Sequence, residues 1–298
     1  MRKDGSREAK FNMGWVWDVS VAQPFDQWKA GARTDLVNEA YIAFAEDRLA
    51  DSIQACANRL RNNPNQEELQ KLQGDAFYLS ASATFNNDVK VPEEKVLGSA
   101  LASYTAALRQ RPNYYEARLM RGSTYLKANR LKEAREDLEA ALKNRPDDAL
   151  ACSFMAETEE SPAVALPWLD HGVRANPESF MNRMRRARVL ALLNRNPEAR
   201  EELDLATRLN PGHYYGWYLR GALRGRTGDM EGAYQDFKET TRRAPLNESA
   251  WFNLGATAKN TGRFREAVDA WEQALKLGAS NRAEIEQLLS ETRKKLGS

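Results

Sequence analysis

Large and small apolar residues recur every three to four positions through most of this chain. The pattern is clearest between residues 246 and 279, where a turn at Thr261-Gly262 separates two apolar stripes. The stripe positions are Trp251, Leu254, Gly255, Ala267, Trp271 and Ala274. A spacing of three to four residues is that of one helix face, so the segment predicts two short amphipathic helices joined by a tight turn.

Small residues mark the places where the two helices of such a pair cross. Gly255 and Ala267 lie there, because a larger side chain would hold the two backbones apart. Equivalent small pairs upstream are Gly122 and Ala134, Ala187 and Ala199, and Gly221 and Ala233. Large residues stand opposite them, namely Tyr125, Leu138, Leu190, Leu203, Trp217 and Phe237. The helix pair is therefore predicted to recur along the chain.

Proline spacing sets the period of this recurrence. The residues concerned are Pro64, Pro112, Pro146, Pro177, Pro211 and Pro245, with successive separations of 48, 34, 31, 34 and 34 residues. Proline lacks an N–H and disfavours helix in the residue before it, so each one closes a helix. The predicted units are 33–64, 65–112, 113–146, 147–177, 178–211, 212–245 and 246–279.

This arrangement resembles the tetratricopeptide repeat, whose signature is W-x2-L-G-x2-Y, then A-x3-F, then P, on a 34-residue period. Trp251, Leu254 and Gly255 match it, while Ala258 replaces the tyrosine and Trp271 the phenylalanine. The resemblance implies an all-α fold, an α-solenoid of helix-turn-helix repeats in a right-handed superhelix. Residues 33–279 would form the array and residues 280–298 a C-terminal capping helix.

Two units depart from the regular length. The second carries 14 extra residues (48 − 34), centred on 80–92, which predicts longer helices, a loop, or both. The fourth is three residues short, so its first helix should end abruptly and Pro162 should begin the second.

Three units place an arginine directly before the crossing glycine or alanine, and each has an acid 16 residues later. The pairs are Arg121 with Asp137, Arg186 with Glu202 and Arg220 with Asp236. In the other four units the first position holds no arginine and the second holds no acid. The coincidence predicts structural charge pairs between the two helices of a repeat, outside any binding site.

Residues 1–32 carry no helical period. Apolar residues occupy every second position from Met13 to Val21, a period of two that predicts an extended, tryptophan-rich arm. Its candidate anchoring residues are Trp15, Trp17, Phe25 and Trp28. Two hypotheses stand for it: the arm caps the first helices of its own array, or it anchors the protein to a partner.

Composition narrows the class of protein. Lys and Arg number 44 against 42 Asp and Glu, so no overall field draws the chain to nucleic acid or to an anionic membrane. There is no apolar run of about 18 residues and no secretory signal. Cys56 and Cys152 fall in different apolar patterns, which predicts two buried thiols rather than a disulfide. The expected location is cytoplasmic, or periplasmic if a leader has been removed.

No motif for chemistry is found. His171 and His213 lie in different units without neighbouring metal ligands, and no phosphate loop or nucleophile motif occurs. The sequence therefore predicts no enzyme, no catalytic residue, no metal and no cofactor.

The resemblance implies protein binding instead, because in that family the first helices of the repeats line a concave groove for an extended peptide or a partner helix. The residues that map to this groove are Phe154, Met181, Met184, Arg185, Arg188, Tyr215, Tyr218, Phe252, Asn253 and Lys259. Aromatic residues, Met and Arg are enriched at interfaces. Arg185 and Arg188 suggest acidic residues in the ligand. The prediction is a non-enzymatic scaffold or adaptor.

Two alternatives remain open at this point. The chain can be a built-in structural or assembly subunit of a larger complex, held by its tryptophan-rich arm. It can also be an RNA-binding helical-repeat protein, through a stripe of arginines at 183, 185, 186 and 188, although the balanced charge disfavours nucleic acid.

Overall fold

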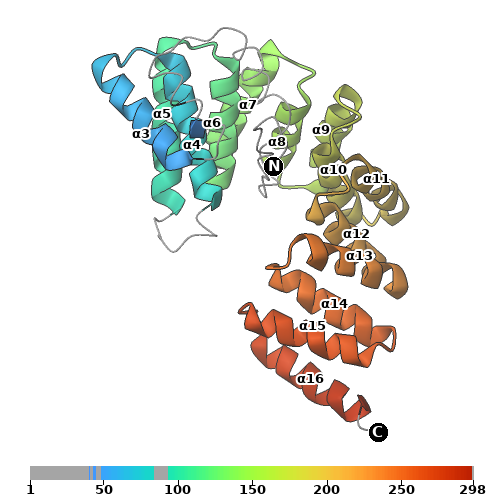
Figure 1. Cartoon of the computed structure of the whole chain (residues 1–298). Helices are drawn as coiled ribbons and strands as arrows, with labels where there is room; N and C mark the ends of the chain where they lie inside the picture. The colour runs from blue at the N-terminus through green and yellow to red at the C-terminus, as the bar shows by residue number, and fades with distance from the viewer. Residues whose placement is uncertain (1–39, 41–42, 45–47, 84–92, 297–298) are drawn as a thin grey trace, which may run out of the picture. The chain divides into compact units, whose positions relative to one another are not determined.

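A computed structural model of the chain describes residue 40, residues 43–44, residues 48–83 and residues 93–296 (Figure 1). Fourteen helices, α3 to α16, are bounded within these residues, and none of the described residues is in a strand. The predicted all-α helical-repeat fold is confirmed. The chain divides into two compact units, Met1–Glu160 and Ser161–Ser298, here called unit 1 and unit 2.

In both units successive helices lie side by side and alternate in direction (Figure 1). The helices of unit 1 are α3 (Leu49–Asn62), α4 (Glu67–Ala83), α5 (Glu93–Gln110), α6 (Tyr115–Lys127), α7 (Leu131–Asn144) and α8 (Ala149–Glu157). Those of unit 2 are α9 (Pro162–Ala175), α10 (Phe180–Leu192), α11 (Asn196–Leu209), α12 (Tyr214–Arg226), α13 (Met230–Arg243), α14 (Glu248–Asn260), α15 (Phe264–Lys276) and α16 (Arg282–Leu296).

Glycine allows the close helix crossings. A Cβ on Gly255 of α14 would lie 2.4 Å from the indole Nε1 of Trp271 on α15. That nitrogen donates to the backbone oxygen of Phe252 at 3.1 Å, and Trp271 is fully buried. A Cβ on Gly122 would likewise lie 3.0 Å from the side chain of Leu138. The predicted crossing positions are thus where a larger residue has no room.

A second recurring contact ties five of the predicted repeats to the proline that precedes each of them. The residue six positions after the proline donates a side-chain hydrogen bond to the proline carbonyl oxygen. The donors are Gln70 to Pro64 at 2.6 Å, Arg118 to Pro112 at 2.6 Å, Arg183 to Pro177 at 2.7 Å, Trp217 to Pro211 at 3.0 Å and Trp251 to Pro245 at 2.8 Å. These side chains satisfy a carbonyl that the following helix leaves without a partner.

The irregular units follow their sequences. The helix α8 has only nine residues, and Pro162 begins α9 after Ser161, whose hydroxyl accepts the N–H of Ala163. The helices α4 and α5 have 17 and 18 residues, against 13 or 14 in most others, so lengthened helices take up part of the extra length. Residues 84–92 of the insertion lie outside the described residues.

At the end of unit 2, α16 packs against α15 through the buried side chains of Ile285 and Leu289. The division of the chain into an arm at 1–32, seven repeats at 33–279 and a cap at 280–298 stays a prediction. The four candidate anchors, Trp15, Trp17, Phe25 and Trp28, lie outside the described residues. The predicted right-handed superhelix also stays a prediction.

Both cysteines are buried and free, as predicted. Burial is the main cause that raises the pKa of the Cys56 thiol to about 12 and that of Cys152 to about 11. Within the described ranges, no helix combines the length and the apolar character that crossing a membrane requires.

Candidate partner-binding surface

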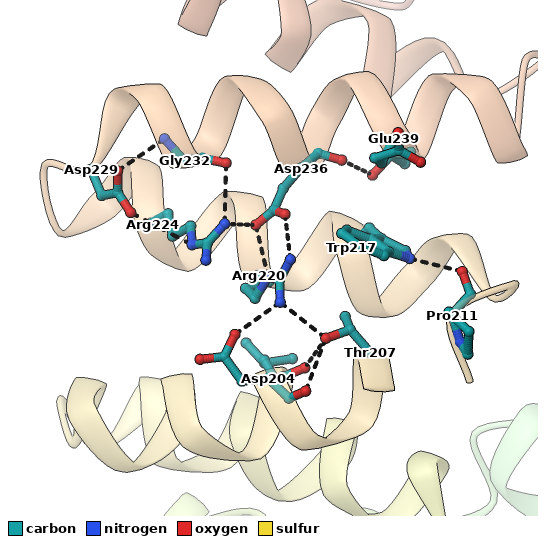
Figure 2. Close-up of polar contacts among 12 residues, drawn as sticks. Asp204, Thr207, Pro211, Trp217, Arg220, Arg224, Asp229, Gly232, Asp236 and Glu239 are labelled. Carbon is teal, nitrogen blue, oxygen red and sulfur yellow. Dashed lines mark hydrogen bonds and ion pairs between the residues drawn. The ribbon is translucent and has the colours of Figure 1, made fainter. Parts of the chain in front are cut away.

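Arg220 on α12 connects three helices of unit 2. Its Nε and Nη2 donate to the carboxylate of Asp236 on α13, at 3.0 and 2.7 Å, while its Nη1 donates to Asp204 on α11 at 2.8 Å. Figure 2 shows the guanidinium between these two acids, with Thr207 of α11 as a further acceptor at 3.0 Å. Asp236 also accepts from Arg224 at 2.9 Å. The predicted pair is confirmed, and it is part of a larger network.

The same arrangement recurs at the other two predicted pairs: an arginine bonds the second helix of its own repeat and that of the preceding repeat. It is called a relay below. Arg186 donates to Glu202 at 2.7 Å and to Asp170 at 2.6 Å. Arg121 donates two bonds to Asp137, at 2.6 and 2.7 Å, and one to Thr105 at 3.1 Å. Each arginine thus bonds a residue 16 positions after it and another 16 positions before it. The earlier partner was missed, although the 34-residue spacing of Asp170 and Asp204 was a signal for it.

Electrostatics keep these arginines charged. Burial by itself would lower the pKa of Arg220, but its hydrogen bonds and charge interactions with Asp236 and Asp204 outweigh burial and raise that pKa. The same balance, with Asp137, raises the pKa of Arg121. A charged guanidinium that is hydrogen-bonded on both sides of each crossing fixes neighbouring helices, and its charge is neutralised by its acidic partners.

Two first helices of unit 2 are unusual in charge. Neither α10 nor α12 contains Asp or Glu, while α10 has four arginines and α12 has three. Arg183 and Arg186 bond Glu202, and Arg185 is buried, so the arginine stripe that suggested RNA binding does not present four free cations. Arg188 is exposed and has no partner among the described residues.

The residues mapped to the predicted groove separate by exposure. Three are buried: Phe154 in unit 1 at 6%, and Met184 and Arg185 in unit 2 at 2% and 9%. The half-buried ones, all in unit 2, are Met181, Tyr215, Tyr218, Phe252, Asn253 and Lys259. Arg188 completes this set as its exposed member. Those mapped groove residues of unit 2 that are not buried lie on α10, α12 and α14. They are called the first-helix surface below.

Met184 is buried because α12 presents a glycine beside it. A Cβ on Gly216 would lie 3.7 Å from the Met184 sulfur and 3.2 Å from a methyl of Thr207. Met184 therefore packs between neighbouring helices. Lys259 has a partner in the final helix, since its Nζ lies 3.2 Å from the carboxylate of Glu291 on α16.

Aromatic rings form the centre of the first-helix surface. Tyr215 and Tyr218 are stacked with ring centroids 6.1 Å apart, and Tyr218 meets Phe237 edge-on at 5.7 Å. The side-chain amide of Asn253 on α14 lies 3.4 Å from the Tyr218 hydroxyl. Burial raises the pKa of Tyr218, although the Asn253 hydrogen bond opposes it, so the phenol stays protonated at neutral pH. The surface therefore offers apolar ring area with polar tips, a combination suited to protein contacts.

His213 extends this cluster, and sequence reasoning gave it no role. Its ring lies 5.1 Å from Phe180 and 5.6 Å from Tyr214, and its Nδ1 accepts the backbone N–H of Tyr215 at 3.3 Å. The side chains of Asp148, Ser179 and Asn247 likewise cap α8, α10 and α14, whereas α6 has no side-chain cap. The shared N-cap position was the signal that could have placed His213.

The described residues hold no group of three or more His, Cys, Asp or Glu side chains arranged to bind a metal. The two buried acids of unit 2, Glu202 and Asp236, accept hydrogen bonds from arginine.

Comparison with protein families matches two stretches of the chain. The model described as "Tetratricopeptide repeat" matches residues 93–157, and a second model of the same description matches residues 248–281, which are α14, α15 and the turn that follows. The matches identify tetratricopeptide repeats in both units of the chain. Tetratricopeptide repeats generally mediate protein–protein interaction, and their fold is typically non-enzymatic.

Solved structures share this fold at low identity. A tetratricopeptide repeat protein from Parabacteroides merdae matches with a TM-score of 0.61 and 17% identity, over 87% of this chain and 97% of that one. Cut9, in the APC/C hetero-tetramer Cut9–Hcn1, matches at 0.60 and 18%, over 86% and 48%. Yeast Tom70 matches at 0.57 and 14%, over 83% and 58%. No curated protein matches the sequence.

Proposed function

We propose that this protein is a non-enzymatic scaffold that binds a segment of a partner protein on the first-helix surface of unit 2. The observation that carries the proposal is the Tyr215–Tyr218 stack, half-buried, hydrogen-bonded to Asn253 and adjacent to helices without acids. Rigid aromatic side chains give large contact area at small entropic cost, which suits a recognition surface.

The fold supports this proposal by fixing the surface. Arg186 and Arg220 tie α10 and α12 to the second helices on both sides. The binding residues are therefore held on a rigid frame before the partner arrives, which lowers the entropic cost of binding. Phe252 extends the same surface onto α14, and a bound segment would cross all three first helices.

Arg188 gives the first-helix surface a positive charge. Arg188 is exposed without a described partner, one turn along α10 from Met184. A partner segment with a carboxylate near its apolar anchor would satisfy this guanidinium, since arginine binds carboxylates through two parallel hydrogen bonds.

The test is affinity capture of partners by the full chain and by two variants. Tyr218→Ala with Arg188→Ala removes the ring and the cation, and each change should weaken binding by about 1–3 kcal/mol. Glu201→Ala with Gln235→Ala is the matched control, because both residues are exposed on the second helices α11 and α13. Partner retention by the first variant, with its helical circular dichroism unchanged, would move the site elsewhere.

A further inference from the structure

A basic residue stands three positions before the end of every predicted repeat. The set is Arg61, Arg109, Lys143, Arg174, Arg208, Arg242 and Lys276, and every member is exposed. Four of them belong to unit 2, at the C-terminal ends of α9, α11, α13 and α15. These four, Arg174, Arg208, Arg242 and Lys276, are called the cation row below.

The cation row lies along the connections that join each second helix to the next first helix. Neighbouring connections lie side by side, because Arg243, next to Arg242, donates its Nε to the carbonyl oxygen of Pro211 at 2.7 Å. The second helices run in the same direction, so their C-terminal ends share this side of unit 2, called the turn edge below (Figure 1).

The acids that could neutralise the row are bound to other cations. A carboxylate four residues earlier on the same helix is the natural partner of a helical lysine or arginine. Asp170 and Asp204, which precede Arg174 and Arg208 by four, are held by the relay arginines at 2.6 and 2.8 Å. Glu272, four before Lys276, accepts a bond of 2.6 Å from Arg293 on α16.

Three row members are consequently left without a partner. Among the described residues, the side chains of Arg174, Arg208 and Lys276 have neither a hydrogen bond nor an ion pair. Arg242 has only the surface contact with Glu239 at 3.1 Å, and its side chain is 67% exposed. Arg174 and Arg208 are thus left unpaired because the relay arginines hold Asp170 and Asp204, and Lys276 because Arg293 holds Glu272.

The helix dipole accounts for one part of this pattern. A cation in the last turn stabilises a helix by about 0.3–1 kcal/mol, whether or not the same side chain also binds a ligand. The dipole does not account for the large apolar side chains on the same edge. Leu209 is 42% exposed beside Arg208, and Leu246 is 77% exposed in the next connection. Cations and exposed leucines together have the composition of a contact surface.

We propose that the turn edge of unit 2 is a second docking surface, which binds an acidic polypeptide segment with interspersed apolar side chains. Carboxylates of the segment would pair with the cation row, and its apolar residues would cover Leu209 and Leu246. A polypeptide fits better than nucleic acid, because exposed leucines make no favourable contact with a phosphate backbone and the net charge of the chain is only +2. This surface is separate from the first-helix surface and does not depend on it.

The probe for the test is a fluorescein-labelled synthetic peptide of repeated Glu-Glu-Leu-Glu units, titrated into the full chain at low salt. The variant Arg174→Glu, Arg208→Glu, Lys276→Glu should weaken its binding about tenfold or more. Arg200→Glu, Arg265→Glu, Lys294→Glu is the control, since it makes the same change in net charge at exposed residues outside the row. Binding by the control should stay within about twofold of the wild type.

Three further measurements keep the outcomes distinct. The same row changed to Gln, with its circular dichroism and melting recorded, separates lost binding from a helix end weakened by reversed charge. Tyr218→Ala should leave binding of this peptide unchanged, because Tyr218 belongs to the first-helix surface. The two proposed surfaces are therefore tested independently of each other. Equal weakening by both charge-reversed variants, no binding by the wild type, or tighter binding of an oligouridylate of equal charge would each overturn the proposal.

Discussion

Arg220 donates two hydrogen bonds to the carboxylate of Asp236, at 2.7 and 3.0 Å, and the Asp236 side chain is only 2% exposed. Such a buried carboxylate depends on its partner, because removing the cation leaves an uncompensated charge in the interior. The first prediction concerns this dependence. Arg220→Ala should lower the free energy of unfolding by about 1–4 kcal/mol, measured by urea denaturation.

The double variant tests the coupling directly. Arg220→Ala with Asp236→Ala should cost less than the sum of the two single changes, because neither charge is then left alone. The control is Arg195→Ala, since the Arg195–Glu198 pair is 44% and 46% exposed. That change should stay within about 0.5 kcal/mol. Strict additivity of the buried pair would contradict the account of the relay.

A second prediction uses two glycines within helices. Gly255→Ala should lower stability by about 1–3 kcal/mol, because the new Cβ would lie 2.4 Å from Trp271 inside a packed crossing. Gly98→Ala should raise stability by about 0.5–1 kcal/mol, since no atom lies within 4 Å of its Cβ position and alanine favours helix. Thermal melting of both variants checks the pair. Equal effects at the two sites would show that the crossing at Gly255 is not close.

The two thiols provide a third prediction. Burial raises the pKa of Cys56 to about 12 and that of Cys152 to about 11, so at pH 8 both are almost wholly in the unreactive thiol form. Iodoacetamide should leave the native protein unmodified and should label both residues in urea. Mass spectrometry counts the adducts. Rapid labelling of Cys56 in the folded chain would mean that the core of unit 1 opens readily.

These features differ in how far the sequence predicts them. The pairing of Arg220 with Asp236 was predictable, because arginine and acid recur together 16 residues apart in three repeats. The second partner, Asp204, was not predicted, because it belongs to the preceding repeat and its contact depends on how two repeats stack. Contacts within a repeat follow from local spacing, whereas contacts between repeats depend on packing across the interface.

The candidate site divides in the same way. Position within a first helix predicted that Tyr215, Tyr218 and Asn253 face the groove, and the structure shows that their side chains contact one another. Position alone did not predict the burial of Met184, which follows from the small size of Gly216 on the next helix. Exposure at a repeat position depends on the volume of the residues that face it, and a single repeat does not specify those residues.

The central claim is that the first-helix surface of unit 2 contacts a partner protein. Photo-crosslinking tests it most directly, with p-benzoylphenylalanine placed at Tyr215 in the full chain and irradiated in native extract. The control places the same group at Gln235, which is exposed on α13. The account predicts a discrete protein adduct from position 215, none from 235, and loss of the adduct when Arg188→Glu is added. Adducts of equal yield from both positions, or an adduct from 235 alone, would contradict it.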